Sequence, residues 1–197
     1  MSRERRKTNM ASELSTMLDE CPIIAAVKNE AGLEQCLQSE IQLVFILYGS
    51  VCEIPAIVQQ VKNAGRSAVV HVDLISGLSP REAAVDFIRQ YTRADGIIST
   101  RPQVLRRAKD LGLATVQRFF VIDSMALENV YKHQEDTRPD FIEMLPGAMP
   151  KILQKLSSSL PTPIIAGGLI SDKEDVMAAL KAGARAISTT NPEIWFM

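Results

Sequence analysis

Two pairs of small residues near the C-terminus have the types and spacing expected of a phosphate site. Gly167 and Gly168 lie in the apolar run "PIIAGGLI", and Thr189 and Thr190 end the next run, "RAISTT". Glycine lets backbone N–H groups approach an oxygen closely, and threonine adds hydroxyl donors. The glycines could instead serve only to make a tight turn, and the threonines could simply suit a strand. Both pairs, however, end successive apolar runs, which favours a shared phosphate site. We therefore predict that these four residues bind the phosphate of a small ligand.

A second set of candidates consists of charged residues within or directly after apolar runs: Lys28, Asp73, Arg118 and Glu143. A charge in an apolar strand is unfavourable unless it is paired or hydrogen-bonded. Three interpretations stay open: a polar cup around the rest of the ligand, ion pairs between strand ends, or acid and base groups of an isomerase or aldolase. We favour the cup, with Lys28 and Arg118 pairing the carboxylates. We expect nearby His71 to be a core histidine with its hydrogen bonds satisfied.

Basic residues cluster in "STRPQVLRRAK", and these are our candidates for contacts with RNA phosphates: Arg101, Arg106, Arg107 and Lys109. The N-terminal "RERRK" is also basic. The net charge of −1 gives no overall basic field, and no RNA-recognition, KH or cold-shock motif is present. RNA contact would therefore depend on local basic density alone.

These residues need elements that bring them to one place. Eight apolar runs alternate with amphipathic stretches, and continuous Val, Ile, Leu and Phe runs are typical of parallel strands buried on both faces. The runs are "PIIAAVK", "LVFILYG", "SAVVHVDLI", "DGIIST", "ATVQRFF", "DFIEMLP", "PIIAGGLI" and "RAISTT". A doubly wound open sheet is the main rival, but there are eight runs and no G-x-G-x-x-G follows the first. We predict an α/β fold, a compact (β/α)8 TIM-type barrel, with its working face at the C-terminal ends of the strands.

Helix boundaries follow from local signals. Ser79-Pro80-Arg81-Glu82 predicts a capped helix start, and Ser171 with Glu174 repeats the capping-box spacing. Left-handed glycines are expected to close helices at Gly65, Gly112 and Gly183, and prolines to begin them at Pro55, Pro102, Pro150 and Pro192.

The last helix is expected to be truncated. Only "NPEIWFM" follows the eighth run, so Asn191 and Pro192 would cap and begin a short stub. The gap in the helical ring would need a cover, either the N-terminal segment "ASELSTMLDE" or another subunit. Trp195 and Phe196 beside this gap would suit a homodimer.

Composition and length bound the class of protein. The 197 residues, 46% hydrophobic and 23% charged, fit one globular domain over residues 1–197, with residues 1–10 as a flexible basic tail. Three scattered cysteines have no metal or redox spacing, which indicates reduced thiols in a cytoplasmic protein. No run is long enough to span a membrane, and no secretory signal follows the basic N-terminus. We expect no metal and no cofactor.

Eight segments together carry a family resemblance: "PIIAAVK", "VFILYGSVCEI", "VVHVDLISGL", "DGIISTR", "VQRFFVIDS", "FIEMLPGAMPKI", "PIIAGGLISDKEDV" and "AISTTNPEIW". In this order they resemble the glycerol-uptake operon antiterminators of Gram-positive bacteria, from about Cys21 to the C-terminus. The resemblance implies a TIM-type barrel used for sensing rather than turnover. It also implies a glycerol 3-phosphate effector and action on the leader mRNA of glycerol-utilisation genes, with phosphate contacts at Gly167, Gly168, Thr189 and Thr190.

Two other readings remain. The chain could be a phosphotriose or phosphosugar enzyme that uses Lys28, Asp73 and Glu143, or a scaffold barrel that binds a phosphometabolite and a protein partner. For the sensor, we expect phosphate binding to order the loops after the last two strands and the stub helix, because an effector acts through its differential affinity for two states.

Overall fold

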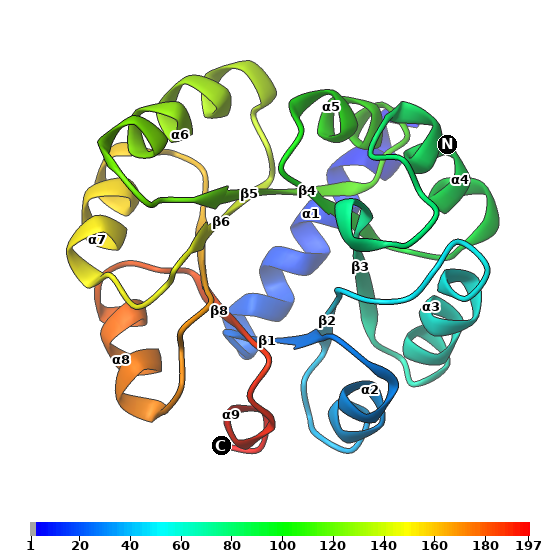
Figure 1. Cartoon of the computed structure of the whole chain (residues 1–197), viewed down its shortest axis with the longest axis horizontal. Coiled ribbons are helices and arrows are strands. Elements are labelled where there is room, and N and C mark those ends of the chain that lie inside the picture. Colours follow the sequence, from blue (N-terminus) through cyan, green and yellow to red (C-terminus); the bar gives the residue numbers. More distant parts are fainter. Residues whose placement is uncertain (1–2) are drawn as a thin grey trace.

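The computed structural model describes the backbone of residues 3–197 and the side chains from Met10 onward. Eight parallel strands form a closed barrel in chain order, each joined to the next through a helix (Figure 1). The strands are β1 (Ile23–Val27), β2 (Leu43–Ile46), β3 (Ser67–His71), β4 (Gly96–Ser99), β5 (Ala114–Phe120), β6 (Phe141–Leu145), β7 (Ile164–Gly167) and β8 (Ala186–Thr189). The predicted TIM-type barrel and all eight predicted strands are confirmed.

Alternation along each strand divides the core into an inner and an outer layer. Side chains inside the barrel form one apolar cluster, to which Phe45, Val69, Val116 and Ile165 contribute. Their sequence neighbours point outward and pack under the helices. Because successive strand residues face opposite sides, burial on both faces requires the near-continuous apolar runs that the sequence has.

Helices cover the barrel as a ring. They are α2 (Glu30–Cys36), α3 (Ile54–Asn63), α4 (Glu82–Tyr91), α5 (Pro102–Asp110), α6 (Ser124–Thr137), α7 (Pro150–Ser159), α8 (Lys173–Lys181) and the short α9 (Pro192–Trp195), with a 3-10 turn, η1 (Val72–Leu74), after β3. The predicted prolines are the first residues of α5, α7 and α9, and Pro55 is the second residue of α3. The three predicted glycines have positive φ, between 74° and 96°, directly after helices. These boundary predictions are confirmed.

Two cap predictions are wrong. Helix α4 begins at Glu82, and its N-cap, Arg81, makes no side-chain cap bond, so the Ser79 capping box does not form. Helix α8 is capped one residue later than predicted, by Asp172, whose carboxylate accepts from the N–H of Asp175 at 2.9 Å. An aspartate adjacent to the helix is as good a cap as serine, and Ser171 instead hydrogen-bonds Asp175.

The N-terminal segment forms α1 (Arg3–Glu20) rather than the flexible tail expected over residues 1–10. Figure 1 shows α1 lying across the barrel. Its Leu14 and Leu18 are buried in the inner cluster against residues at the start of strands, such as Ile24 and Phe141, so α1 closes the N-terminal end of the barrel. Residues 1 and 2 of the expected tail lie outside the described residues.

The gap beside the truncated eighth helix is covered in part by the stub itself and not by the N-terminal segment, while a second subunit at this place stays a prediction. In Figure 1, α9 lies between α8 and α2, as predicted for the stub. Trp195 of α9 is buried and joins the outer cluster that includes Leu33 of α2. The tryptophan of the stub therefore covers part of the gap. Helix α1 lies elsewhere, across the N-terminal end of the barrel.

Candidate functional site

Two of the predicted phosphate residues, Gly168 and Thr190, lie in adjacent loops at the C-terminal end of the barrel, and the other two, Gly167 and Thr189, are the last residues of β7 and β8. Gly168 and Leu169 follow β7 with φ of 72° and 58°, and Thr190 follows the neighbouring strand β8. The backbone N–H groups of these three residues donate to no acceptor among the described residues. A left-handed conformation is unusual for leucine and concentrates at functional sites. Unpaired N–H groups in adjacent loops are suited to an anion.

Thr189, the fourth predicted phosphate residue, has a different position. It is buried, its hydroxyl donates to the carbonyl oxygen of Ile170 at 3.3 Å, and it accepts from the N–H of Asn191 at 3.1 Å. Thr189 therefore joins the two loops from outside the barrel, whereas Thr190 is exposed.

A buried polar layer lies directly beneath these loops. Its members are each two residues beyond a residue of the inner apolar cluster, so they continue the inner face of their strands. They are His71 on β3, Arg118 on β5, Glu143 on β6, Gly167 on β7 and Ser188 on β8. The side chains of all four non-glycine members are at least nine-tenths buried. The predicted cup residues Arg118 and Glu143 thus come together inside the barrel.

Glu143 is the centre of this layer. Its Oε2 accepts from Arg118 Nε at 2.6 Å, and its Oε1 accepts from the Ser188 hydroxyl at 2.5 Å. A Cβ on Gly167 would lie 2.6 Å from Ser188 Oγ and 2.8 Å from Glu143 Oε1. The glycine predicted for phosphate approach is therefore also needed to make room for the carboxylate. Sequence reasoning missed Ser188, although its alternation with Ala186 would have placed it inside.

Asp73 and Lys28 do not share this layer's hydrogen bonds. Asp73 accepts from the Ser99 hydroxyl at 2.7 Å and from the N–H and hydroxyl of Thr100 at 2.8 and 2.9 Å. It therefore fastens the end of β4 to the 3-10 turn after β3. Lys28 is exposed and makes no ion pair within the described residues. Of the two predicted carboxylate partners, Arg118 is confirmed and Lys28 is wrong.

His71 differs from the satisfied core histidine that we expected. It is buried, but its Nδ1 has no hydrogen-bond partner among the described residues. Burial, followed by the positive charge of Arg118, lowers the pKa of His71 to about 4, although Asp73 acts in the opposite direction. The imidazole is therefore neutral at pH 7 and has an unused nitrogen beside the ion pair.

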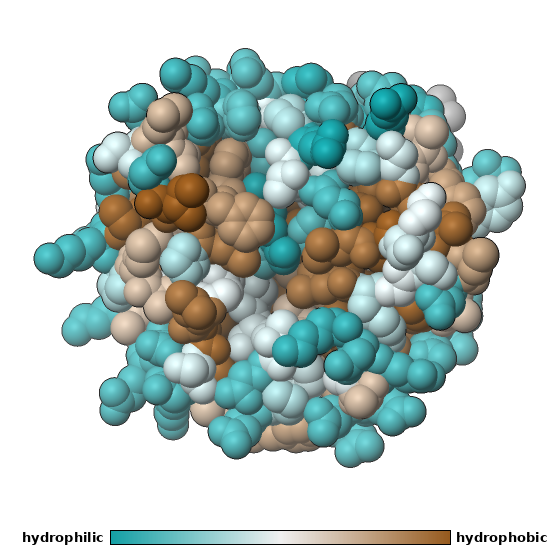
Figure 2. Space-filling model, in the orientation of Figure 1, coloured by the Kyte–Doolittle hydropathy of each residue, from teal (hydrophilic) through white to brown (hydrophobic). Residues whose placement is uncertain are grey.

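Exposed apolar side chains lie around the polar layer at the C-terminal end of the barrel. Figure 2 shows this face of the molecule, with apolar atoms (brown) on both sides of a polar centre. Exposed apolar side chains lie at or just after the C-terminal ends of β3, β5 and β7: Leu74, Phe120, Ile122, Met125 and Leu169. Ile122 and Leu169 are 82% and 75% exposed.

The four candidate RNA contacts lie on or beside α5, and they differ in whether the side chain already has a hydrogen-bond partner within the protein. Arg107 binds Asp86 through Nε and Nη2, at 2.9 and 2.6 Å, and Lys109 donates to the carbonyl oxygen of Arg138. Arg101 and Arg106 are exposed, and their side chains make no hydrogen bond or ion pair within the described part of the chain.

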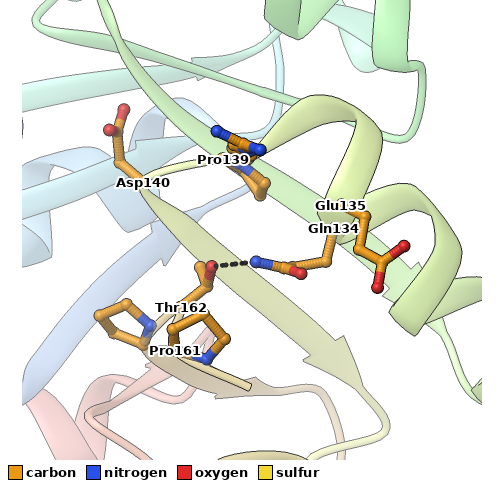
Figure 3. Close-up of a pocket in the computed structure, with 8 residues that line it drawn as sticks. Gln134, Glu135, Pro139, Asp140, Pro161 and Thr162 are labelled. Atoms are coloured by element: carbon orange, nitrogen blue, oxygen red, sulfur yellow. Dashed lines mark hydrogen bonds between the residues drawn. The ribbon is translucent and has the colours of Figure 1, made fainter.

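Two cavities open at the opposite end of the barrel, where strands begin. The larger, about 680 Å³, lies among the segments before β6 and β7, and Figure 3 shows Gln134 of α6 pointing toward Thr162, with a hydrogen bond of 3.2 Å. The second, about 370 Å³, lies beside it around Pro161 and Arg185. None of the predicted site residues lines either cavity.

The described residues contain neither a metal-binding cluster nor a membrane-spanning helix. No group of three or more His, Cys, Asp or Glu residues is arranged to hold a metal ion there. None of the described helices is long and apolar enough to cross a membrane.

Comparison with known proteins gives the family. A family model described as glycerol-3-phosphate responsive antiterminator matches residues 23–195. A glycerol uptake operon antiterminator regulatory protein from Listeria monocytogenes str. 4b F2365 has 35% sequence identity and a TM-score of 0.86, covering 89% of this chain and 95% of its own. An antiterminator-related protein from Thermotoga maritima MSB8 has 32% identity and a TM-score of 0.79, covering 89% and 98%.

Other matches are consistent with this. The Escherichia coli (strain K12) protein YgcP is 44% identical over 179 residues, which cover 91% of this chain and 94% of that protein. A deoxyribose phosphate aldolase from Aeropyrum pernix, at 16% identity and a TM-score of 0.66, shares the fold alone. The chain belongs to the glycerol-3-phosphate responsive antiterminator family.

Proposed function

We propose that this chain is a glycerol-3-phosphate-responsive transcription antiterminator that acts in the cytoplasm on the leader mRNA of glycerol-utilisation genes, without chemical turnover of its ligand. Family membership supports the assignment. The observation that carries the ligand part is the set of unpaired N–H groups of Gly168, Leu169 and Thr190 directly above the polar layer. Glycerol 3-phosphate would place its phosphate on these groups and its glycerol moiety toward Arg118 and Glu143.

A sensing role agrees with how the carboxylates are used. Both oxygens of Glu143 and both oxygens of Asp73 already accept hydrogen bonds from the protein. A Schiff-base lysine needs a desolvated amine, whereas Lys28 is exposed. The competing proposal, a phosphotriose or phosphosugar enzyme, has the barrel fold in its favour. Turnover of the ligand, abolished by Glu143→Gln, would establish that alternative.

The effector signal would reach the surface through the loops that hold α9. Thr189 joins both loops, Asn191 Nδ2 donates to the carbonyl oxygen of Ser171 at 2.8 Å, and Trp195 Nε1 donates to that of Thr189 at 3.0 Å. Phosphate binding would order these segments and change an adjoining surface. Hydrogen exchange that is equally slow in these loops with and without ligand would contradict this mechanism.

RNA contact is proposed at Arg101 and Arg106, the two candidates whose side chains have no partner among the side chains described from Met10 onward. The test is leader-RNA binding at several salt concentrations, with and without glycerol 3-phosphate. The double variant Arg101→Gln, Arg106→Gln should weaken binding and reduce its salt dependence, because each lost phosphate contact lowers the slope by about one. Arg93→Gln with Lys151→Gln is the matched control, since it removes two exposed charges elsewhere, one in the loop before β4 and one in the first turn of α7. Unchanged RNA affinity in the first variant would exclude this surface.

A further inference from the structure

The polar layer has unused hydrogen-bonding capacity that a ligand could satisfy. Arg118 donates from Nε to Glu143, while its two terminal nitrogens donate to no described residue. His71 Nδ1 is also without a partner. Each oxygen of Glu143 accepts one hydrogen bond and can accept another. The layer therefore offers both donors and acceptors.

This layer is one residue from the proposed phosphate site. The Cβ position of Gly167 lies within 3 Å of Glu143 Oε1 and Ser188 Oγ, and the next residue, Gly168, has the unpaired N–H. A small phosphomonoester held by Gly168 and Thr190 would therefore direct its other end toward Glu143 and Arg118.

The charge of the layer limits what that other end can be. One positive charge, on Arg118, is already paired with the buried carboxylate of Glu143, and His71 is neutral at pH 7. A ligand hydroxyl adds no charge and can donate to Glu143 while it accepts from Arg118. A ligand carboxylate would place a second negative charge beside Glu143 with one guanidinium to share, which is unfavourable where water is excluded.

We infer that the Arg118–Glu143 pair is a specificity filter that admits phosphomonoesters of polyols and rejects those that carry a carboxylate. The inference rests on the proposed function, since it assumes that the phosphate binds at the loops after β7 and β8. Glu143 is the residue that determines the selectivity, Arg118 supplies the donors, and Ser188 and Gly167 position the carboxylate.

The test compares two ligands of similar size, glycerol 3-phosphate and 3-phosphoglycerate, by titration calorimetry. The unmodified protein should prefer glycerol 3-phosphate by at least about tenfold, since one added like charge or one lost charged hydrogen bond is worth about that factor. Glu143→Gln frees the charge of Arg118 for the ligand, so the preference should invert: glycerol 3-phosphate should bind about tenfold more weakly and 3-phosphoglycerate more tightly. Ser188→Ala keeps both charges and removes one hydrogen bond to the carboxylate, so it should reduce the preference without inverting it.

Two control variants distinguish a change in ligand selectivity from a loss of folding or of phosphate binding. Glu135→Gln changes an exposed glutamate at the opposite end of the barrel and should leave both affinities unchanged. If Glu143→Gln does not fold, the double variant Arg118→Met, Glu143→Leu removes the pair together, a change that buried pairs often tolerate, and should reduce the preference to near unity.

Two results would contradict these proposals, one the filter alone and the other the proposed function. Equal weakening of both ligands by Glu143→Gln, with the preference intact, would overturn the filter and leave the proposed function standing. Failure of the unmodified protein to bind glycerol 3-phosphate would overturn the proposed function itself.

Discussion

The indole Nε1 of Trp195 donates a hydrogen bond of 3.0 Å to the carbonyl oxygen of Thr189, the residue that joins the two loops of the proposed phosphate site. Trp195 is buried, and it is the only tryptophan in the chain. The C-terminal helix α9 is therefore attached directly to the loop that contains Thr190, and one aromatic side chain can report on it.

The first prediction concerns this tryptophan. Glycerol 3-phosphate should change the intensity or emission wavelength of Trp195 fluorescence in a saturable way, because ordering of the Thr190 loop alters the indole environment. Inorganic phosphate should give the same change at higher concentration, and Trp195→Phe should remove the signal. A spectrum that stays constant while calorimetry detects binding would show that α9 is not coupled to the ligand.

A methyl group at position 167 should disrupt the site. Gly167→Ala would place a Cβ 2.6 Å from Ser188 Oγ and 2.8 Å from Glu143 Oε1, and both atoms are fixed by hydrogen bonds. We expect the free energy of unfolding to fall by about 1–3 kcal/mol and the affinity for glycerol 3-phosphate to fall at least about tenfold. Denaturant unfolding and calorimetry measure the two effects.

The control for this variant is Gly65→Ala. Gly65 has a φ of 74°, but its Cβ position has no atom within 4 Å, and it lies before β3 at the other end of the barrel. Its substitution should lower stability by about 1 kcal/mol and leave affinity unchanged. Equal affinities for the two variants would mean that the space at Gly167 is not used by the site.

His71 should make stability depend on pH. Its pKa is lowered to about 4 in the folded protein from an ordinary 6.5, so between these values the unfolded chain binds a proton that the native state does not. The free energy of unfolding should therefore decrease as pH falls from about 6.5 to about 4, by about 3 kcal/mol from this group. Denaturant titrations across that range measure the slope.

Each of the two histidines can be removed in turn. His71→Asn should flatten the dependence of unfolding free energy on pH, whereas His133→Asn, at a partly exposed position on α6, should keep it. The same slope in His71→Asn as in the unmodified protein would show that other groups produce it.

Helix α1 should stabilise the barrel without taking part in binding. Leu14 is buried against the N-terminal ends of the strands, at the end of the barrel opposite the site. Leu14→Ala should lower the free energy of unfolding by about 2–5 kcal/mol, and the exposed neighbour Glu13→Ala should have little effect. Affinity for glycerol 3-phosphate should be unchanged in both. A large loss of affinity in Leu14→Ala at a temperature where it remains folded would contradict this separation.

The sequence predicted the barrel well because its signals are local and repeated. Eight apolar runs and the glycines and prolines between them fix the strands, and proline and glycine act through their own backbone restrictions. The cap at Ser171 was wrong because the next residue, Asp172, is an equally good cap and was the one used, and the cap at Ser79 was wrong because α4 begins only at Glu82, without a side-chain cap.

The site was predictable only in part. The pairing of Glu143 with Arg118 could be predicted, because a lone buried charge is unfavourable. Asp73 and Thr189, however, hydrogen-bond residues of neighbouring loops, and Lys28 makes no ion pair within the described residues. Ser188 was missed because a serine in a strand carries no signal of its own. Its role follows from barrel closure, which brings β8 within hydrogen-bonding distance of β6 across the barrel interior.

The central claim is that unpaired N–H groups after β7 and β8 bind the phosphate of glycerol 3-phosphate, and titration calorimetry tests it most directly. The purified protein should bind glycerol 3-phosphate saturably at one site per chain, inorganic phosphate more weakly, and glycerol not at all, with the ligand recovered intact. No saturable binding of glycerol 3-phosphate, or its conversion to another compound during the titration, would contradict the account.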